Sequence, residues 1–262
     1  MAIYDYAGNE ITVAADSLKE RDYYCAFSLF RTIGVVGDSY ANGYCGENAS
    51  DNSGVNHPEV SWPQIIARRN GVEVTNYAWG GMLTRSFITD TSVGLPKLES
   101  DAPKGLYILA LERNDYNREN GGISGYLGSI ADIENNSLGS YPDTFFGNYA
   151  TIIERIQAHA PGAKLVMMAG DYSKSNALGT AYNNAVVAIA AHYGIPCMEQ
   201  MESEYFSGSN AYYREKSAGG HPAPYAYCGM ALAIERLFNQ CVAENKAYFM
   251  YYVGVPDDQS ET

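Results

Sequence analysis

The sequence predicts an α/β fold in which a mostly parallel, five-stranded sheet is covered by helices on both faces. Short apolar runs alternate with longer segments that repeat apolar residues at helical spacing, which favours strands joined by crossover helices. The run at 105–111 is apolar throughout, as expected for a strand buried on both faces. With 262 residues, 46% of them hydrophobic, the chain can form one such domain without a disulfide or a metal.

Five strands and four main helices are expected along the chain. The predicted strands are 32–36, 72–77, 105–111, 163–169 and 195–198. The predicted helices are 61–71, 146–160, 178–193 and 225–242. The first helix has a serine cap, an early proline and a glycine at its end, which are typical helix boundary signals. The polar segment 112–145 is expected to be a long loop, and a loop of that length in a compact domain is usually functional or mobile.

The two ends of the chain are expected to be short extensions of one main domain. Residues 1–30 form a predicted N-terminal extension, residues 31–244 the main domain, and residues 245–262 a C-terminal tail. The N-terminal extension contains two strand-like pieces, at 2–4 and 10–14, separated by a turn signal. In the tail, residues 247–255 are expected to add an edge strand before a disordered end.

Composition disfavours several classes of function. The chain has 17 Lys and Arg against 30 Asp and Glu, a formal net charge of −13, which argues against binding nucleic acid or an anionic membrane surface. The five cysteines form no CxxC pair or Cys/His cluster, so we expect reduced, packed thiols and no metal site. We find no apolar run of membrane-spanning length and no signal peptide. A cytoplasmic location is therefore the default, and a secreted or phage-associated one applies if a leader was removed.

Polar residues follow the predicted strands at the edge where a parallel sheet binds its ligands. In chain order they are Asp38 and Ser39 after the first strand, Gly80 and Gly81 after the second, Glu112, Arg113, Asn114 and Asp115 after the third, and His221 before the last helix. An imidazole can activate a serine hydroxyl, which is otherwise a poor nucleophile. Backbone N–H groups and an asparagine amide can stabilise the oxyanion that forms when an ester is attacked.

The order and spacing of these segments resemble the four blocks of the SGNH/GDSL hydrolase family over about residues 30–242. The resemblance implies a flavodoxin-like three-layer α/β/α sandwich and an acyl hydrolase that needs no cofactor. It implies that Ser39 is the nucleophile and that His221 is first the general base and then the general acid. It also implies an oxyanion hole made of the backbone N–H groups of Ser39 and Gly81 and the side-chain amide of Asn114.

Two positions depart from the family pattern. The family carries an aspartate three residues before the histidine, where this chain has Ala218. A backbone carbonyl could orient His221 instead, leaving a Ser–His dyad, or another acid could do so: Glu199, Glu202, Glu204 or Glu215. The family has glycine where this chain has Glu112, and a carboxylate there would oppose an oxyanion unless Arg113 or Arg118 paired with it.

Two further acids are expected to modulate the site. Asp38 is expected to shape the turn around Ser39 by hydrogen bonding, and Asp115 to orient its loop by capping. The favoured function is removal of O-acyl groups, most simply acetyl, from a carbohydrate or another small polar ester. The chain has no extended apolar lid, and the segment 112–145 is rich in Tyr, Asn and Gly, which suits a polar substrate.

The alternative is a non-catalytic or weakly active carbohydrate-binding or accessory module on the same scaffold, for example one associated with a phage or a cell surface. Ala218 and Glu112 motivate this alternative. Phosphoryl or nucleotide chemistry is disfavoured because the sequence has no phosphate-cradling loop.

Overall fold

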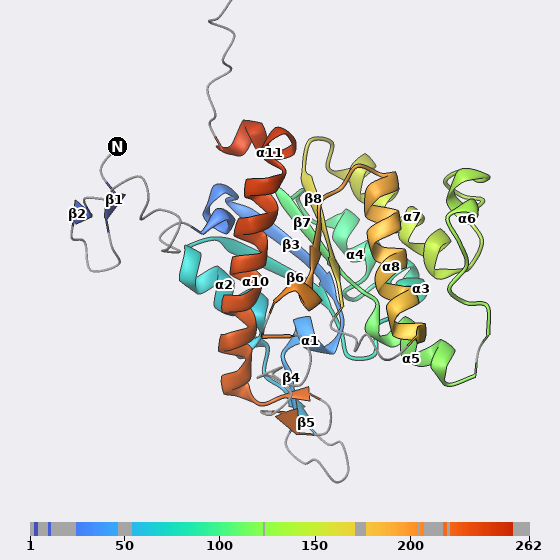
Figure 1. Ribbon diagram of the computed structural model, residues 1–262, viewed down its shortest axis with the longest axis horizontal. Helices are drawn as coiled ribbons and strands as arrows, with labels where there is room; N and C mark the ends of the chain where they lie inside the picture. The colour runs from blue at the N-terminus through green and yellow to red at the C-terminus, as the bar shows by residue number, and fades with distance from the viewer. Residues whose placement is uncertain are drawn as a thin grey trace, which may run out of the picture.

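A parallel five-stranded sheet forms the centre of the molecule (Figure 1). The computed structural model describes residues 3–4, 10–11, 25–46, 54–122, 124–170, 177–203, 205–206, 217–218 and 221–253. The sheet has the order β6-β3-β7-β8-β9, and every neighbouring pair is parallel. The strands are β3 (Thr32–Gly37), β6 (Glu73–Ala78), β7 (Leu106–Ala110), β8 (Lys164–Ala169) and β9 (Cys197–Glu199). This is the strand order of flavodoxin-like folds, so the predicted fold class is confirmed.

Helices cover both faces of this sheet (Figure 1). On one face, α2 (Trp62–Asn70) packs against α10 (Pro224–Glu244). The other face carries α7 (Phe145–His159) and α8 (Ala177–His192). Beside α7 lie the shorter α3 (Thr84–Thr89) and α4 (Leu95–Ser100), two helices that the sequence analysis did not predict.

Each central strand contributes to two hydrophobic cores, because successive side chains of a strand point to opposite faces. On β7, Leu106 and Ile108 belong to the core beneath α2 and α10. Tyr107 and Leu109 belong to the core beneath α7 and α8. These four side chains are all buried, which explains why the run was apolar throughout.

Small elements gather at the carboxyl edge of the sheet. The helix α1 (Ser39–Asn42) follows β3, and β4 (Tyr44–Gly46) pairs antiparallel with β5 (Gly54–Asn56). A second antiparallel pair, β10 (Ser217–Ala218) and β11 (His221–Pro222), lies against β4. The short 3-10 helices η3 (Pro58–Val60) and η4 (Gln200–Glu202) follow β5 and β9, whereas η2 (Ala26–Leu29) precedes β3.

The prediction of one long loop at 112–145 is wrong, because this segment contains α5 (Arg113–Asn120) and α6 (Ala131–Glu134). The sequence of α5 is polar nearly all round, so no apolar period reveals it. Tertiary contacts hold it instead. Tyr116 is buried, and Glu119 accepts hydrogen bonds from the Tyr182 hydroxyl (2.7 Å) and the Leu127 N–H (2.9 Å).

The predicted edge strand at 247–255 is also wrong, because α11 (Lys246–Val253) occupies this part of the chain. Its aromatic composition favours a strand, but the packing of its side chains stabilises a helix instead. The Phe249 ring is fully buried, with its centroid 6.3 Å from that of Phe30 and 6.1 Å from that of Phe238. Residues 254 and 255 lie outside the described residues.

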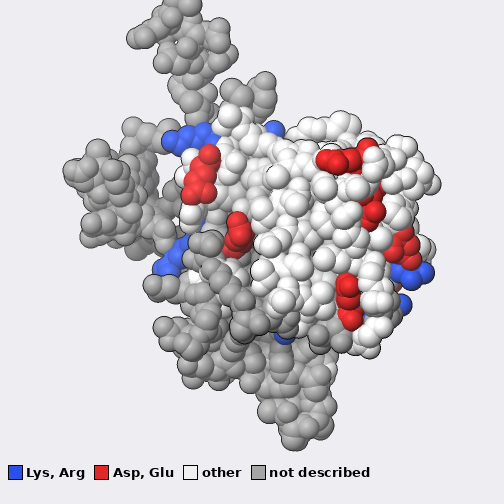
Figure 2. All heavy atoms as spheres, turned by 45° about the vertical axis from the view of Figure 1, so that its right-hand side comes forward, with Lys and Arg blue, Asp and Glu red and all other residues white. Residues whose placement is uncertain are grey.

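At the N-terminus, β1 (Ile3–Tyr4) pairs antiparallel with β2 (Glu10–Ile11), at the two places where strand-like pieces were expected. The division into extensions and a domain at 31–244 stays a prediction. In the part of the chain that the structure describes, no helix is both long and apolar enough to cross a membrane. Figure 2 shows acidic side chains scattered over one face of the molecule, with wide uncharged areas between them.

Candidate active site

Ser39 is the first residue of α1 and follows β3 through Asp38. The Asp38 carboxylate caps the helix by accepting a hydrogen bond from the Tyr40 N–H at 2.9 Å. The helix has one turn only, because Gly43 ends it in the left-handed conformation with a φ of 77°. A Cβ at this position would also lie 2.4 Å from the His57 carbonyl oxygen, so glycine is required. The chain therefore turns back at once into β4.

Asn114 links the ends of neighbouring strands. It lies in the first turn of α5, directly beyond β7, and its Nδ2 donates hydrogen bonds to Asp38 Oδ2 (3.1 Å) and to the Met82 carbonyl (3.2 Å). Asp38 follows β3 and Met82 follows β6, so one amide connects three strand ends. The Asn114 Nδ2 atom lies within hydrogen-bond distance of both acceptors, and donation to an oxyanion by Asn114 stays a prediction.

Gly81 lies in an exposed turn after β6, closed by a hydrogen bond from the Met82 N–H to the Trp79 carbonyl at 3.1 Å. Its φ of 77° is a conformation that only glycine adopts without strain. The turn lies next to the strand that carries Ser39, since β6 and β3 are neighbours in the sheet. A second backbone N–H donor from Gly81 stays a prediction.

Asp115 is fully buried and fixes the beginning of α3. Its carboxylate accepts hydrogen bonds from the Thr84 N–H (3.1 Å), the Thr84 hydroxyl (2.7 Å) and the Tyr126 hydroxyl (3.0 Å). Burial raises the pKa of this carboxyl to about 6, although the hydrogen bonds from Thr84 and Tyr126 oppose that rise. Asp115 therefore holds α3 and α5 together behind the turn of Gly81 and the amide of Asn114.

His221 lies on β11 with its Nε2 2.9 Å from Ser39 Oγ, although the two residues are 182 positions apart in sequence. Two aromatic rings contact the imidazole. The Tyr40 centroid lies 5.3 Å away with the planes inclined by 33°, and the Tyr44 centroid lies 4.7 Å away in an edge arrangement at 66°. The sequence analysis did not single out either tyrosine, and their only signal was proximity to Ser39.

Ala218 is the cross-strand partner of His221 in the β10–β11 pair, so the position where the family carries aspartate lies opposite the histidine. Glu199 ends β9 with an exposed side chain. The side chains of Glu202, Glu204 and Glu215 lie outside the described residues. Which group faces Nδ1 of His221 therefore stays a prediction.

Glu112 is buried at the end of β7, and its Oε2 accepts a hydrogen bond from the Gly170 N–H at 2.6 Å. This bond joins the ends of β7 and β8 by a backbone donor, which the sequence analysis did not anticipate. The Arg113 guanidinium, one of its two proposed partners, lies 5.9 Å from the centroid of the Tyr40 ring. The other, Arg118, is exposed on α5.

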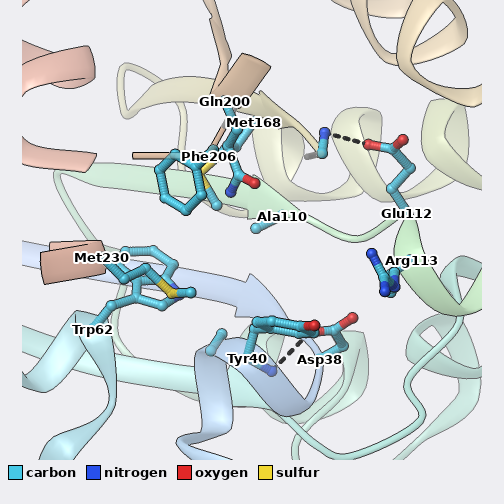
Figure 3. A pocket seen from close by; sticks show the side chains of 12 residues that line it. Asp38, Tyr40, Trp62, Ala110, Glu112, Arg113, Met168, Gln200, Phe206 and Met230 are labelled. Atoms are coloured by element: carbon cyan, nitrogen blue, oxygen red, sulfur yellow. Dashed lines mark hydrogen bonds between the residues drawn. The ribbon is translucent and has the colours of Figure 1, made fainter. Parts of the chain in front are cut away.

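A pocket opens beside α1 (Figure 3). Figure 3 shows Trp62, Phe206 and Met230 at one end of it and Glu112 and Arg113 at the other. The remaining lining residues are Asp38, Tyr40, Ala41, Ala110, Met168, Gly170 and Gln200. Within the described residues no group of three or more His, Cys, Asp or Glu side chains could hold a metal ion.

The strand order and the meeting of a serine with a histidine at the carboxyl edge define a flavodoxin-like domain of the SGNH type. The chain belongs to the GDSL-like lipase/acylhydrolase family, whose model matches residues 35–227. A comparison with curated proteins gives no match.

Solved structures with the same fold have low sequence identity to this chain. A possible lipase from Chitinophaga pinensis is 15% identical, with a TM-score of 0.57, covering 80% of this chain and 98% of that chain. The carbohydrate acetylesterase Est24 from Sinorhizobium meliloti is 15% identical, with a TM-score of 0.56 and coverages of 80% and 99%. A family 2 carbohydrate esterase with a carbohydrate-binding domain, from Corynascus thermopiles (Myceliophthora fergusii), is 16% identical, with a TM-score of 0.56 and coverages of 90% and 70%.

Proposed function

We propose that this protein is a serine esterase in which Ser39 and His221 carry the chemistry. The single observation that carries this proposal is the distance of 2.9 Å between Ser39 Oγ and His221 Nε2. A nucleophile and its base must lie within hydrogen-bond reach for the proton to pass as the new bond forms. Membership of the acylhydrolase family supports the same chemistry.

In the proposed reaction, Ser39 Oγ attacks the acyl carbon while its proton moves to His221 Nε2. The oxyanion then accepts hydrogen bonds from the N–H groups of Ser39 and Gly81 and from the Asn114 amide. When the tetrahedral intermediate collapses, the imidazolium of His221 protonates the departing alcohol and an acyl-enzyme remains on Ser39. Water, deprotonated by His221, attacks the acyl-enzyme. The imidazolium then returns this proton to Ser39 Oγ as the carboxylic acid leaves. These steps need only the groups of the chain and water.

We further propose that the substrate is an O-acetylated carbohydrate. Two of the few exposed large apolar side chains flank the site in sequence: Trp79, 54% exposed, two residues before Gly81, and Tyr225, 58% exposed, four residues after His221. An exposed aromatic ring offers a flat apolar face against which the C–H groups of a sugar ring can pack. Two of the three solved structures described above are carbohydrate esterases, which supports the same substrate class.

The test measures hydrolysis of p-nitrophenyl acetate and acetylated xylan by the wild type and by Ser39→Ala. We expect Ser39→Ala to lower kcat by at least about 10³-fold on both substrates. Ser137→Ala, on an exposed turn, is the matched control and should keep full activity. Equal background rates in the wild type and Ser39→Ala would overturn the proposal. Binding of the acetylated xylan without hydrolysis would then favour the carbohydrate-binding alternative.

A further inference from the structure

We infer that Tyr40 and Tyr44 are positioning residues, which hold the His221 imidazole in the orientation that proton transfer needs. This inference rests on the proposed esterase function and deepens it. It addresses what orients His221 in a chain that has Ala218 where the family carries aspartate, since a methyl group cannot accept a hydrogen bond from the histidine. Orienting the imidazole is the usual task of the third member of a catalytic triad.

Two ring contacts limit the movement of the imidazole. Tyr40 contributes a ring inclined by only 33° to that of His221, with the centroids 5.3 Å apart. Tyr44 contributes an edge contact at 66° and 4.7 Å. Both arrangements fall in the range that aromatic pairs prefer, and rotation of His221 about its side-chain bonds would break them. The ring with these contacts is the ring whose Nε2 meets Ser39.

The local chain builds this arrangement from one short turn. Tyr40 lies on α1 and Tyr44 begins β4, and Gly43 between them reverses the chain so that both reach the same histidine. The Tyr44 carbonyl accepts a hydrogen bond from the Tyr227 hydroxyl at 2.7 Å. Tyr227 lies on α10, the helix that follows His221 directly. The nucleophile, the two rings and the histidine are therefore parts of one connected unit.

Aromatic rings also lie beside the charged form of His221 that arises during the reaction. When Ser39 transfers its proton, the imidazole becomes an imidazolium, and the electron-rich faces of aromatic rings attract cations. The Arg113 guanidinium also lies over the Tyr40 ring, at 5.9 Å from its centroid, so Tyr40 has two cationic neighbours during that step. Substitutions of Tyr44 therefore give the simpler experiment.

The experiment compares Tyr44→Leu with Tyr44→Phe on two acetate esters that form the same acetyl-enzyme. p-Nitrophenyl acetate has a leaving group that departs as an anion, whereas benzyl acetate has one that must be protonated by His221 as it leaves. Because kcat/KM reports the acylation step, a misoriented imidazole should lower it more for benzyl acetate. We expect Tyr44→Leu to lower kcat/KM by about tenfold on benzyl acetate and by clearly less on p-nitrophenyl acetate. Tyr44→Phe keeps the ring and should stay within about twofold of the wild type on both.

Equal losses on the two esters would overturn the inference, as would equal losses in the Leu and Phe variants. Thermal unfolding of each variant separates misorientation from loss of fold. If Tyr44→Leu does not fold, Tyr40→Leu and Tyr40→Phe on the same two esters decide the question by the same criteria. Equal activity of the wild type and Ser39→Ala would overturn the proposed function and this inference together. If Ser39→Ala is inactive but Tyr44→Leu loses equal activity on both esters, only the inference is overturned.

Discussion

The nucleophile and the histidine of the candidate site are held in different ways. Around Ser39, hydrogen bonds connect the ends of three neighbouring strands: Asp38 caps α1, and the Asn114 amide joins Asp38 to the Met82 carbonyl. Around His221, the contacts include the bond to Ser39 Oγ and two aromatic rings, and Ala218 is its neighbour across the β10–β11 pair. The histidine lies on a two-residue strand outside the main sheet.

This difference shows two ways to position a reacting group. Hydrogen bonds at strand ends constrain distance and direction, because they weaken steeply when donor and acceptor move out of alignment. Ring packing limits the rotation of a side chain but tolerates small displacements. We therefore expect substitutions around Ser39 to have larger effects on activity than substitutions around His221.

Among the residues that support Ser39 and His221, the largest effect should come from Asn114→Ala. This change removes a predicted oxyanion donor and the link between Asp38 and Met82, so we expect kcat on p-nitrophenyl acetate to fall by about 10²- to 10³-fold. Asn117→Ala, on the exposed side of the same helix, is the control and should keep the wild-type rate. A loss below about fivefold for Asn114→Ala would show that the amide has only a structural role.

The buried Asp115 carboxyl should make the free energy of unfolding depend on pH. Its pKa is raised to about 6, so the folded state binds the proton more tightly than the unfolded state does. The resulting stability is fully present below about pH 4 and is lost as the pH rises through about 6. We expect this group to change the unfolding free energy by about 3 kcal/mol over that window.

Urea unfolding of the wild type and Asp115→Asn between pH 4 and pH 7 measures this contribution. The difference between the two proteins isolates Asp115 from the other carboxyls, such as Asp90, whose pKa is lowered by hydrogen bonds from Ser92 and Val93. A difference that does not change with pH would contradict the expectation.

Ala218→Asp should act on the same imidazole as the tyrosine rings. The position lies opposite His221 in the β10–β11 pair, so a carboxylate there can supply the acceptor that the family pattern has. We expect kcat/KM on benzyl acetate to rise by less than about tenfold in the wild type and by more in the Tyr44→Leu background, because residues that act on one group are not additive.

Four proteins complete this double-mutant cycle: the wild type, the two single variants and the double variant. Ser217→Asp adds the same charge one residue away and serves as the control. Additive effects of the two substitutions would show that the tyrosine and the carboxylate act independently.

The smallest effect should come from Trp79→Ala, two residues before Gly81. We expect kcat/KM to fall by about fivefold to tenfold on acetylated xylo-oligosaccharides, because a stacking surface for the sugar is lost. The rate on p-nitrophenyl acetate should not change. Leu138→Ala removes another exposed apolar side chain, 47% exposed, and should affect neither substrate. Equal losses on both substrates would argue against a sugar contact at Trp79.

Much of the fold could be predicted because strands buried on both faces are apolar over their whole length. The apolar run at 105–111 is an example, and it contains β7. Helix α5 could not be predicted, since its residues are polar apart from Tyr116. One buried aromatic residue next to Asp115 does not make an apolar period. Helix α11 was predicted as a strand, because its aromatic residues favour strands while Phe249 packs into the core beneath α10.

By itself, the sequence determined the order of the strand ends and the polar residues that follow them, because a parallel sheet places all such ends on one edge. Ser39 and Asn114 could be selected on that ground, and His221 by the resemblance of its segment to the last block of the SGNH/GDSL family. Only the tertiary structure decided how His221 is held, since contacts between rings depend on the path of α1, Gly43 and β4 and leave no periodic signal. The same holds for Glu112, whose partner is the backbone N–H of Gly170 on another strand end, 58 positions away.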